Sequence, residues 1–203
     1  MFERKDFGLP LNSFVFCNFN QLYKITPKEV QVWSEILRQV PNSVLWLLKF
    51  PAAGESNLKS HFAKLGVNEE RIVFTDLASK EVHLSRIKLA DLCLDTFLCS
   101  GHTTTSDLLW AGLPIITLFE DQSFCSRVAS SLVMSSNCKL SKVCKSVSDY
   151  ITSAVDFANV KRETTEKSMK LFDHLEYVSN YEKGLQIAWE NYSNEFEFKD
   201  IHL

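Results

Sequence analysis

A continuous apolar run at residues 44–50 constrains the fold of this chain more than any other stretch. The run reads Val-Leu-Trp-Leu-Leu-Lys-Phe, and it does not alternate between apolar and polar side chains. A strand with one face in water would alternate, because successive side chains point to opposite faces of a sheet. We therefore predict a strand that is buried on both faces, which is typical of a parallel sheet covered by helices.

Strands and helices are predicted to alternate along most of the chain. The strands are expected at residues 11–19, 44–50, 71–74, 92–97 and 115–118. The helices are expected at residues 26–40, 57–65, 80–89, 103–111 and 124–134. The sharpest helix start is formed by Thr26 as cap, Pro27 in the first position and Glu29 closing a capping box. Short joints between these elements predict an α/β fold with a Rossmann-like, mostly parallel sheet and helices on both faces.

The same pattern predicts three segments. Residues 1–12 show no clear periodicity and form an N-terminal extension, residues 13–145 form the α/β lobe, and residues 146–203 form C-terminal helices. Apolar side chains between Leu185 and Trp189 predict that the terminal helix packs back on the lobe. At 203 residues, one domain with a helical appendage is large enough to bury a sizeable core.

Composition and charge exclude several classes of partner. The chain has 22 basic and 25 acidic side chains, which argues against general nucleic-acid binding and against a polybasic membrane surface. No apolar run approaches the roughly 20 residues that cross a bilayer, and the charged N-terminus leads into no signal-type stretch. The six cysteines form no CxxC pair and no metal-like spacing with the five histidines, so we expect reduced thiols and no metal.

The joint between the fourth predicted strand and its helix, residues 98–107, has unusual polar content. Gly101 permits a tight turn, and the hydroxyls of Thr103, Thr104 and Thr105 occupy positions where helix caps belong. A helix N-terminus presents unpaired N–H groups and about half a positive charge, which makes it a ready site for a phosphate. On this stretch alone, an ordinary capped joint explains the residues equally well.

Polar side chains follow three predicted strands at the edge where a parallel α/β sheet binds its ligands. Three cations among them, together with a helix N-terminus, are the combination that two phosphates require. A histidine ring can stack on a base, and an aspartate can accept a hydrogen bond from a sugar hydroxyl. Taken singly, Lys24, Lys80 and Arg86 are most simply solvated surface charges. The candidates are Gln21 and Lys24 after the first strand, Ala78, Lys80, His83 and Arg86 after the third, and His102, Thr103, Thr104 and Asp107 after the fourth.

Several long stretches of the chain match the pattern of one known family. They are residues 16–25 (FCNFNQLYKI), 41–48 (PNSVLWLL), 89–96 (LADLCLDT), 101–104 (GHTT) with Asp107, 109–112 (LWAG) and 126–129 (SRVA). In this order, over about residues 12–192, they closely resemble the protein O-linked N-acetylglucosamine (O-GlcNAc) transferase family. The resemblance implies the C-terminal lobe of a two-lobed (GT-B) glycosyltransferase with UDP-N-acetylglucosamine (UDP-GlcNAc) as donor substrate. It also implies inverting transfer of N-acetylglucosamine, without a metal or other cofactor, to Ser or Thr of proteins in the cytoplasm and nucleus.

The resemblance implies which residues would hold the diphosphate end of the donor. Gln21 and Lys24 would face the diphosphate and the sugar. His102, Thr103 and Thr104 would bracket the diphosphate at the helix start. Lys24 would be the catalytic residue, because its charge and the helix dipole would stabilise the leaving diphosphate.

The nucleoside end is assigned in the same way. The resemblance implies that Ala78 and Arg86 hold the uracil edge and that His83 stacks on the uracil. Lys80 and Asp107 would bind the ribose.

The sequence departs from the family pattern at three places. Ser79 stands where the family usually has Pro, and Thr105 stands where it usually has Gly. Residues 119–123 replace a Pro-Gly-Glu-type loop, with one extra residue and an acidic pair. The acidic pair would weaken sugar or phosphate binding if it faced the site.

The sequence also contains neither the tetratricopeptide repeats nor the N-terminal catalytic lobe of the family. We therefore expect a fragment or a truncated paralogue that binds UDP-GlcNAc and needs the other lobe for transfer to protein acceptors. An alternative is a non-catalytic UDP-sugar-binding or interaction module derived from that lobe. A third interpretation is a different sugar-nucleotide enzyme of similar design, such as an epimerase.

Overall fold

The computed structural model describes residues 2–119, 123–160, 170–194 and 201. The chain divides into two compact units, Met1–Ser168 and Met169–Leu203. The first unit holds the sheet and the helices that cover it, and the second holds a short 3-10 turn (Lys170–Phe172) and the helix α7 (His174–Ser193). Among the described helices, none is long and apolar enough to cross a membrane.

Six parallel strands form one sheet in the first unit. They are β1 (Phe14–Asn18), β2 (Ser43–Leu48), β3 (Ile72–Thr75), β4 (Leu92–Leu94), β5 (Ile115–Leu118) and β6 (Lys142–Cys144). Their order across the sheet is β3-β2-β1-β4-β5-β6, so the chain reverses its direction of travel between β1 and β4. Ligands of such sheets bind outside the carboxyl ends of the strands at this point of reversal. The predicted α/β class with a mostly parallel sheet is confirmed.

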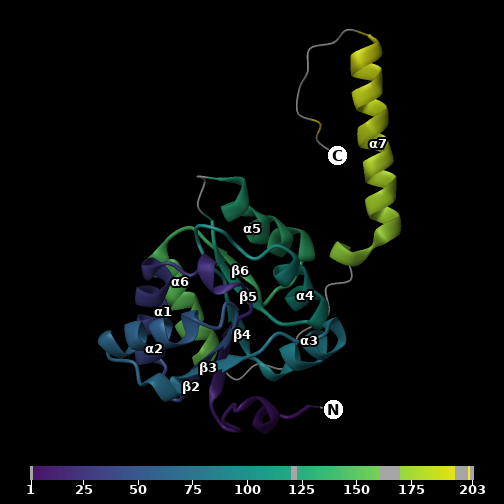
Figure 1. The fold of residues 1–203 in the computed structure, drawn as a ribbon. Helices are drawn as coiled ribbons and strands as arrows, with labels where there is room; N and C mark the ends of the chain where they lie inside the picture. The colour runs from purple at the N-terminus through teal and green to yellow at the C-terminus, as the bar shows by residue number, and fades with distance from the viewer. Residues whose placement is uncertain (1, 120–122, 161–169, 195–200, 202–203) are drawn as a thin grey trace. The chain divides into compact units, whose positions relative to one another are not determined.

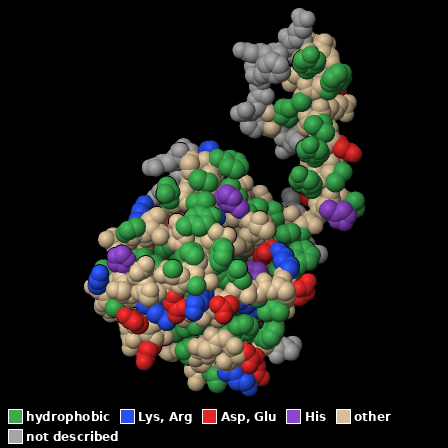
Figure 2. Space-filling model, in the orientation of Figure 1, with side chains coloured by type: hydrophobic (Ala, Val, Ile, Leu, Met, Phe, Trp, Pro, Cys, Tyr) green, Lys and Arg blue, Asp and Glu red, His purple; other side chains and the backbone are tan. Residues whose placement is uncertain are grey.

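Helices cover both faces of the sheet. They are α1 (Pro27–Gln39), α2 (Gly54–Lys64), α3 (Lys80–Arg86), α4 (Thr103–Ala111), α5 (Phe124–Ser136) and α6 (Val147–Asn159). Figure 1 shows α1, α2 and α6 on one side of the sheet and α3, α4 and α5 on the other. Figure 2 shows acidic and basic side chains interspersed on the visible face of this unit.

The core explains why β2 has an apolar sequence. All six residues of β2 are buried, as the uninterrupted run predicts. Leu45 and Leu47 join the core that β2 shares with α1, while Trp46 packs between the rings of Phe7 and Phe19, 5.4 and 5.0 Å away. Each such side chain contributes on the order of 2 kcal/mol to folding through burial.

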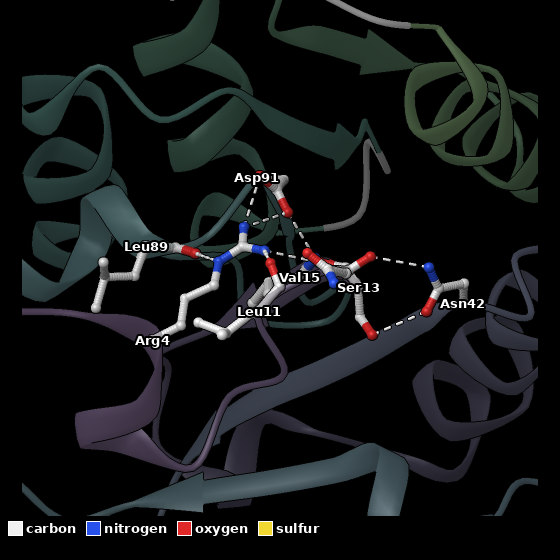
Figure 3. A network of polar contacts seen from close by, with 8 residues as sticks. Arg4, Leu11, Ser13, Val15, Asn42, Leu89 and Asp91 are labelled. Carbon is white, nitrogen blue, oxygen red and sulfur yellow. Dashed lines mark hydrogen bonds and ion pairs between the residues drawn. The ribbon is translucent and has the colours of Figure 1, made fainter.

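Arg4 joins residues 1–12 to the amino edge of the sheet (Figure 3). The guanidinium of Arg4 makes a two-pronged ion pair with Asp91 at 2.9 and 3.0 Å. It also donates to the backbone carbonyl oxygens of Leu11, Ser13 and Leu89. An extension without sequence periodicity is therefore held in place by the contacts of Arg4 and by the ring of Phe7 against Trp46.

Three local features differ from the predicted elements. The edge strand β6 was not predicted, because its three residues carry no apolar run. The helix predicted over 80–89 is α only to Arg86 and then tightens into a 3-10 turn, Ile87–Leu89. The strand predicted over 92–97 pairs only as Leu92–Leu94, so Asp95 belongs to the loop that follows. The packing of α7 on the lobe stays a prediction.

Candidate functional site

One cavity at the carboxyl edge of the sheet brings together every predicted site residue. Its volume is about 430 Å³, and the loops after β1, β3 and β4 all contribute to it. Its wall also contains Phe19, Asn20, Tyr23, Leu48 and Leu77, which the sequence analysis did not select. The predicted residues that line it are Gln21, Lys24, Ala78, Lys80, His83, Arg86, His102, Thr103, Thr104 and Asp107.

Lys24 lies where the loop after β1 meets the turn before α4. It ends the 3-10 turn Leu22–Lys24, and its Nζ donates to the carbonyl oxygen of Ser100 at 2.8 Å. An ammonium group has three N–H donors, so this bond leaves two for a ligand. The positive charge is thus held beside the N-terminus of α4.

The N-terminus of α4 is built differently from the sequence prediction. The helix begins at Thr103, and its N-cap residue is His102. The side chain of His102 makes no capping hydrogen bond to the helix. The prediction that threonine hydroxyls cap this helix is therefore wrong: Thr104 donates its hydroxyl to Oδ1 of Asn20 at 2.6 Å instead, and Thr105 is buried. Because the cap residue makes no side-chain hydrogen bond to them, the first N–H groups of α4 suit an incoming anion.

The part of the cavity wall formed by Phe19 and α3 is aromatic and cationic. The ring of His83 meets the ring of Phe19 edge to face at 5.3 Å, and the guanidinium of Arg86 lies 5.3 Å from the same ring. Arg86 is buried and donates to the carbonyl oxygen of Asp76, while its Nε has no partner among the described residues. Burial lowers the pKa of His83, and the charge of Arg86 lowers it further. A neutral imidazole over an aromatic floor suits a planar base.

Lys80 and Asp107 pair across the cavity. The Nζ of Lys80, on α3, donates to Oδ1 of Asp107, on α4. Their side chains are 54% and 16% exposed, so the lysine faces water and the carboxylate is mostly sheltered. The pair keeps the two helix starts together and leaves Oδ2 of Asp107 as a further acceptor.

Two polar residues, Asn20 on the cavity wall and Asp95 behind it, were not predicted from the sequence. Asp95 is buried and accepts a hydrogen bond from the Gly101 N–H, and Asn20 links that neighbourhood to Thr104. The only signal in the sequence was an acidic residue inside the apolar run 92–97.

Two of the three departures from the family pattern are accommodated locally. Ser79 is the N-cap of α3 and accepts from the Val82 N–H at 3.5 Å, which is a role that serine favours. The hydroxyl of Thr105 fills the space in which a side chain on Gly101 would lie. The acidic pair at residues 120–121 lies outside the described residues.

The described residues include no group of three or more His, Cys, Asp or Glu side chains placed to hold a metal ion. All six cysteines are free thiols.

A family model described as glycosyl transferase family 41 matches residues 1–180. The chain is 42% identical over 196 residues to a probable UDP-N-acetylglucosamine–peptide N-acetylglucosaminyltransferase SEC of Arabidopsis thaliana, covering 92% of this chain and 20% of that protein. It is 40% identical over 201 residues to a UDP-N-acetylglucosamine–peptide N-acetylglucosaminyltransferase of Caenorhabditis elegans, covering 95% and 17%. The chain thus spans about a fifth of the length of these relatives.

Solved structures show the same architecture. A Thermobaculum terrenum O-GlcNAc transferase mutant superposes with a TM-score of 0.67 at 29% identity, over 73% of this chain and 29% of that one. The Anabaena protein Alr3699/HepE in complex with UDP superposes with a TM-score of 0.54 at 14% identity, over 94% and 51%. The second likeness concerns the fold alone.

Proposed function

This chain belongs to glycosyl transferase family 41, and we propose that it is the UDP-GlcNAc-binding lobe of a UDP-GlcNAc–peptide N-acetylglucosaminyltransferase. The names of its relatives support the donor and the peptide acceptor. The observation that carries the proposal is the cavity, because ten residues from the loop after β1, from α3 and the segment leading into it, and from the start of α4 meet there, with a lysine beside an uncapped helix start.

The donor would lie along the cavity with its uracil at the aromatic end. The uracil would stack on His83 and meet Ala78 and Arg86 at its edge. The ribose hydroxyls would donate to Asp107, beside Lys80. This placement uses the neutral imidazole and the mostly sheltered carboxylate in the roles that their surroundings favour.

The diphosphate would then reach the N-terminus of α4. Gln21 and His102 would flank it, the N–H groups and hydroxyls of Thr103 and Thr104 would donate to it, and Lys24 would neutralise part of its charge.

Transfer is an inverting displacement at the anomeric carbon. The oxygen of a Ser or Thr hydroxyl bonds to that carbon as the bond to the β-phosphate oxygen breaks. UDP leaves with the electron pair, and the hydroxyl proton passes to a base outside this chain or to water. Lys24 and the dipole of α4 stabilise the charge that grows on UDP, which is how the reaction proceeds without a metal. The acceptor and the groups that activate it would be held by an N-terminal lobe and repeats in a longer protein.

Calorimetric titration with UDP tests the proposal. UDP is expected to bind the chain weakly, and Lys24→Ala is expected to weaken binding about tenfold, the loss of one charge-assisted hydrogen bond. Lys64→Ala is the matched control, because Lys64 is an exposed lysine of α2 that does not line the cavity. No heat at millimolar UDP, or equal loss in both variants, would contradict the proposal.

A second candidate function is a non-catalytic module that binds a UDP-sugar or another protein. The exposed apolar side chains of Tyr23 and Leu77 on the cavity wall, 69% and 61% exposed, favour a face that meets another protein. The two candidates differ in turnover: release of UDP in the presence of an acceptor peptide and the N-terminal lobe of a relative supports the enzyme. Stable association with that lobe without UDP release supports the module.

We also propose that the chain acts in the cytoplasm and nucleus. Free thiols at all six cysteines suit a reducing compartment. Immunofluorescence of the tagged full chain tests this location.

A further inference from the structure

A buried carboxylate lies between the sheet and the turn that leads into α4. The side chain of Asp95 is almost wholly buried, and the residue as a whole is 1% exposed. Its Oδ1 accepts from the Gly101 N–H at 2.8 Å, and its Oδ2 accepts from the hydroxyl of Thr117, on β5, also at 2.8 Å. The carboxylate therefore ties the turn to the central strands.

Asn20 carries this network to the cavity wall. Its Nδ2 donates to the hydroxyl of Thr96 at 3.0 Å and lies 3.4 Å from Oδ1 of Asp95. Its Oδ1 accepts from the hydroxyl of Thr104 at 2.6 Å. Because the amide nitrogen is held by the Asp95 loop, the carbonyl end of the amide faces Thr104.

We propose that Asp95 is a positioning residue of the donor site, which places the Gly101 turn and, through Asn20, directs the hydroxyl of Thr104. The inference rests on the proposed function, because the position of this turn matters to binding only if the cavity holds a diphosphate. Lys24 contacts the same turn, because its Nζ donates to the carbonyl oxygen of Ser100, directly before Gly101.

The helix layer holds the backbone of Asp95 in place. The hydroxyl of Tyr150, on α6, donates to the carbonyl oxygen of Asp95 at 3.0 Å. The indole N–H of Trp33, on α1, donates in turn to the hydroxyl of Tyr150 at 3.4 Å, and both rings are fully buried. Because α6 holds the main chain of Asp95 in place, the side chain of Asp95 can hold the Gly101 turn in place.

The ionisation of Asp95 falls near neutral pH. Burial raises its pKa to about 6, although hydrogen bonds from Gly101, Thr117 and Thr96 and the charge of Lys24 lower it. The other titratable groups that face it have raised pKa values: Cys93, hydrogen-bonded to Cys17 and buried, and Tyr150, which is buried. Both groups stay neutral near pH 6. The ionisation of Asp95 is therefore governed by its burial, its hydrogen-bond donors and the charge of Lys24.

Two possible roles of this carboxylate predict opposite effects when its charge is removed. If Asp95 acted only through its charge, Asp95→Asn would tighten binding of an anionic donor, because a repulsive charge would be gone. If it positions the turn, the same substitution weakens binding. An amide presents N–H donors where one carboxylate oxygen accepted a hydrogen bond, so the turn loses a fixed contact.

Calorimetric titration with UDP-GlcNAc at pH 7.5 separates the two roles. Asp95→Asn is expected to bind about tenfold more weakly than the wild type, as for the loss of one hydrogen bond to a charged group. Asp91→Asn is the matched control, because Asp91 lies at the opposite end of β4, away from the cavity, and pairs with Arg4. It is expected to leave the affinity of the folded protein unchanged. Unchanged or tighter binding by Asp95→Asn overturns the proposal.

The pH profile of binding gives a readout that a loss of stability would not produce. UDP-GlcNAc is the right probe, because its diphosphate has no group that titrates near pH 6, whereas the terminal phosphate of UDP does. From pH 7.5 to 5.5 the wild-type affinity is expected to fall relative to that of Asp95→Asn. Every other ionisable side chain is common to both proteins, so the difference between the two profiles isolates Asp95. Parallel profiles overturn the proposal.

A further measurement needs neither a variant nor a donor. In the free wild-type protein, the amide resonance of Gly101 is expected to titrate with a midpoint near pH 6, as Asp95 ionises. If the donor binds but Gly101 does not titrate, the positioning role fails and the proposed function stands. If Gly101 titrates but no donor binds, the proposed function fails, and the positioning role fails with it.

Discussion

At the scale of single residues, Asp95 makes the stability of the fold depend on pH in an unusual direction. Burial raises its pKa from 3.8 to about 6, so the folded state binds this proton more tightly than the unfolded chain does. The stabilisation is fully present below about pH 4 and is lost as pH rises through 6. A shift of this size corresponds to about 3 kcal/mol.

Urea unfolding at a series of pH values measures this effect. Between pH 4 and 7 the wild type is expected to lose about 3 kcal/mol relative to Asp95→Asn, which has no proton to release. The difference between the two proteins is the useful quantity, because carboxylates with lowered pKa values, such as Glu55 and Asp149, act on both proteins in the opposite direction. Curves that stay parallel would show that Asp95 ionises as freely in the fold as in the unfolded chain.

At the scale of elements, the start of α4 depends on a close approach between its first turn and the preceding loop. A Cβ on Gly101 would overlap the hydroxyl of Thr105 and come within 3.1 Å of that of Thr104 and 3.4 Å of Oδ1 of Asn20. Gly101→Ala is therefore expected to displace the turn and weaken UDP-GlcNAc binding about tenfold or more. Calorimetric titration measures the change.

A second substitution provides the control for this prediction. Thr105→Gly removes the side chain that the new methyl group meets most closely, so the double variant is expected to recover part of the lost affinity. The recovery should come with a loss of about 1 kcal/mol of stability, because glycine is unfavourable within a helix. A double variant that binds no better than Gly101→Ala would show that the turn is not limited by this contact.

Elements with a strong local pattern were predictable, and elements that depend on distant partners were not. The apolar run of β2 and the capping box at Thr26 both occur where the sequence places them, because each is determined by neighbouring residues. The three residues of β6 are a strand only because they pair with β5. The contact between Arg4 and Asp91 joins residues 87 positions apart, and the Asp95 network joins the loops after β1 and β4 to β5 and α6. The positions of polar residues after the strands were enough to predict much of the cavity wall. No sequence pattern indicated the buried groups behind that wall.

At the scale of the whole molecule, the two edges of the sheet have different roles: one forms the binding cavity, and the other stabilises the fold. The carboxyl edge carries the cavity, which is lined by Lys24 from the turn after β1 and by His83 and Arg86 from α3. The amino edge carries the Arg4 network, which closes the start of β1 and β4 with the N-terminal extension (Figure 3). Residues that stabilise the fold without touching the cavity should therefore be found at the amino edge.

Replacing Arg4 tests this separation. Arg4→Ala removes hydrogen bonds to three carbonyl oxygens and leaves Asp91 without its ion-pair partner, so the free energy of unfolding is expected to fall by about 2–3 kcal/mol. Because none of these partners lines the cavity, the UDP-GlcNAc affinity of the folded protein should stay within about twofold. Lys5→Ala is the control, since its pair with Glu3 is 70% and 60% exposed and contributes less than about 1 kcal/mol. Weaker donor binding by Arg4→Ala at unchanged stability would mean that the two edges are coupled, and that the extension serves the site.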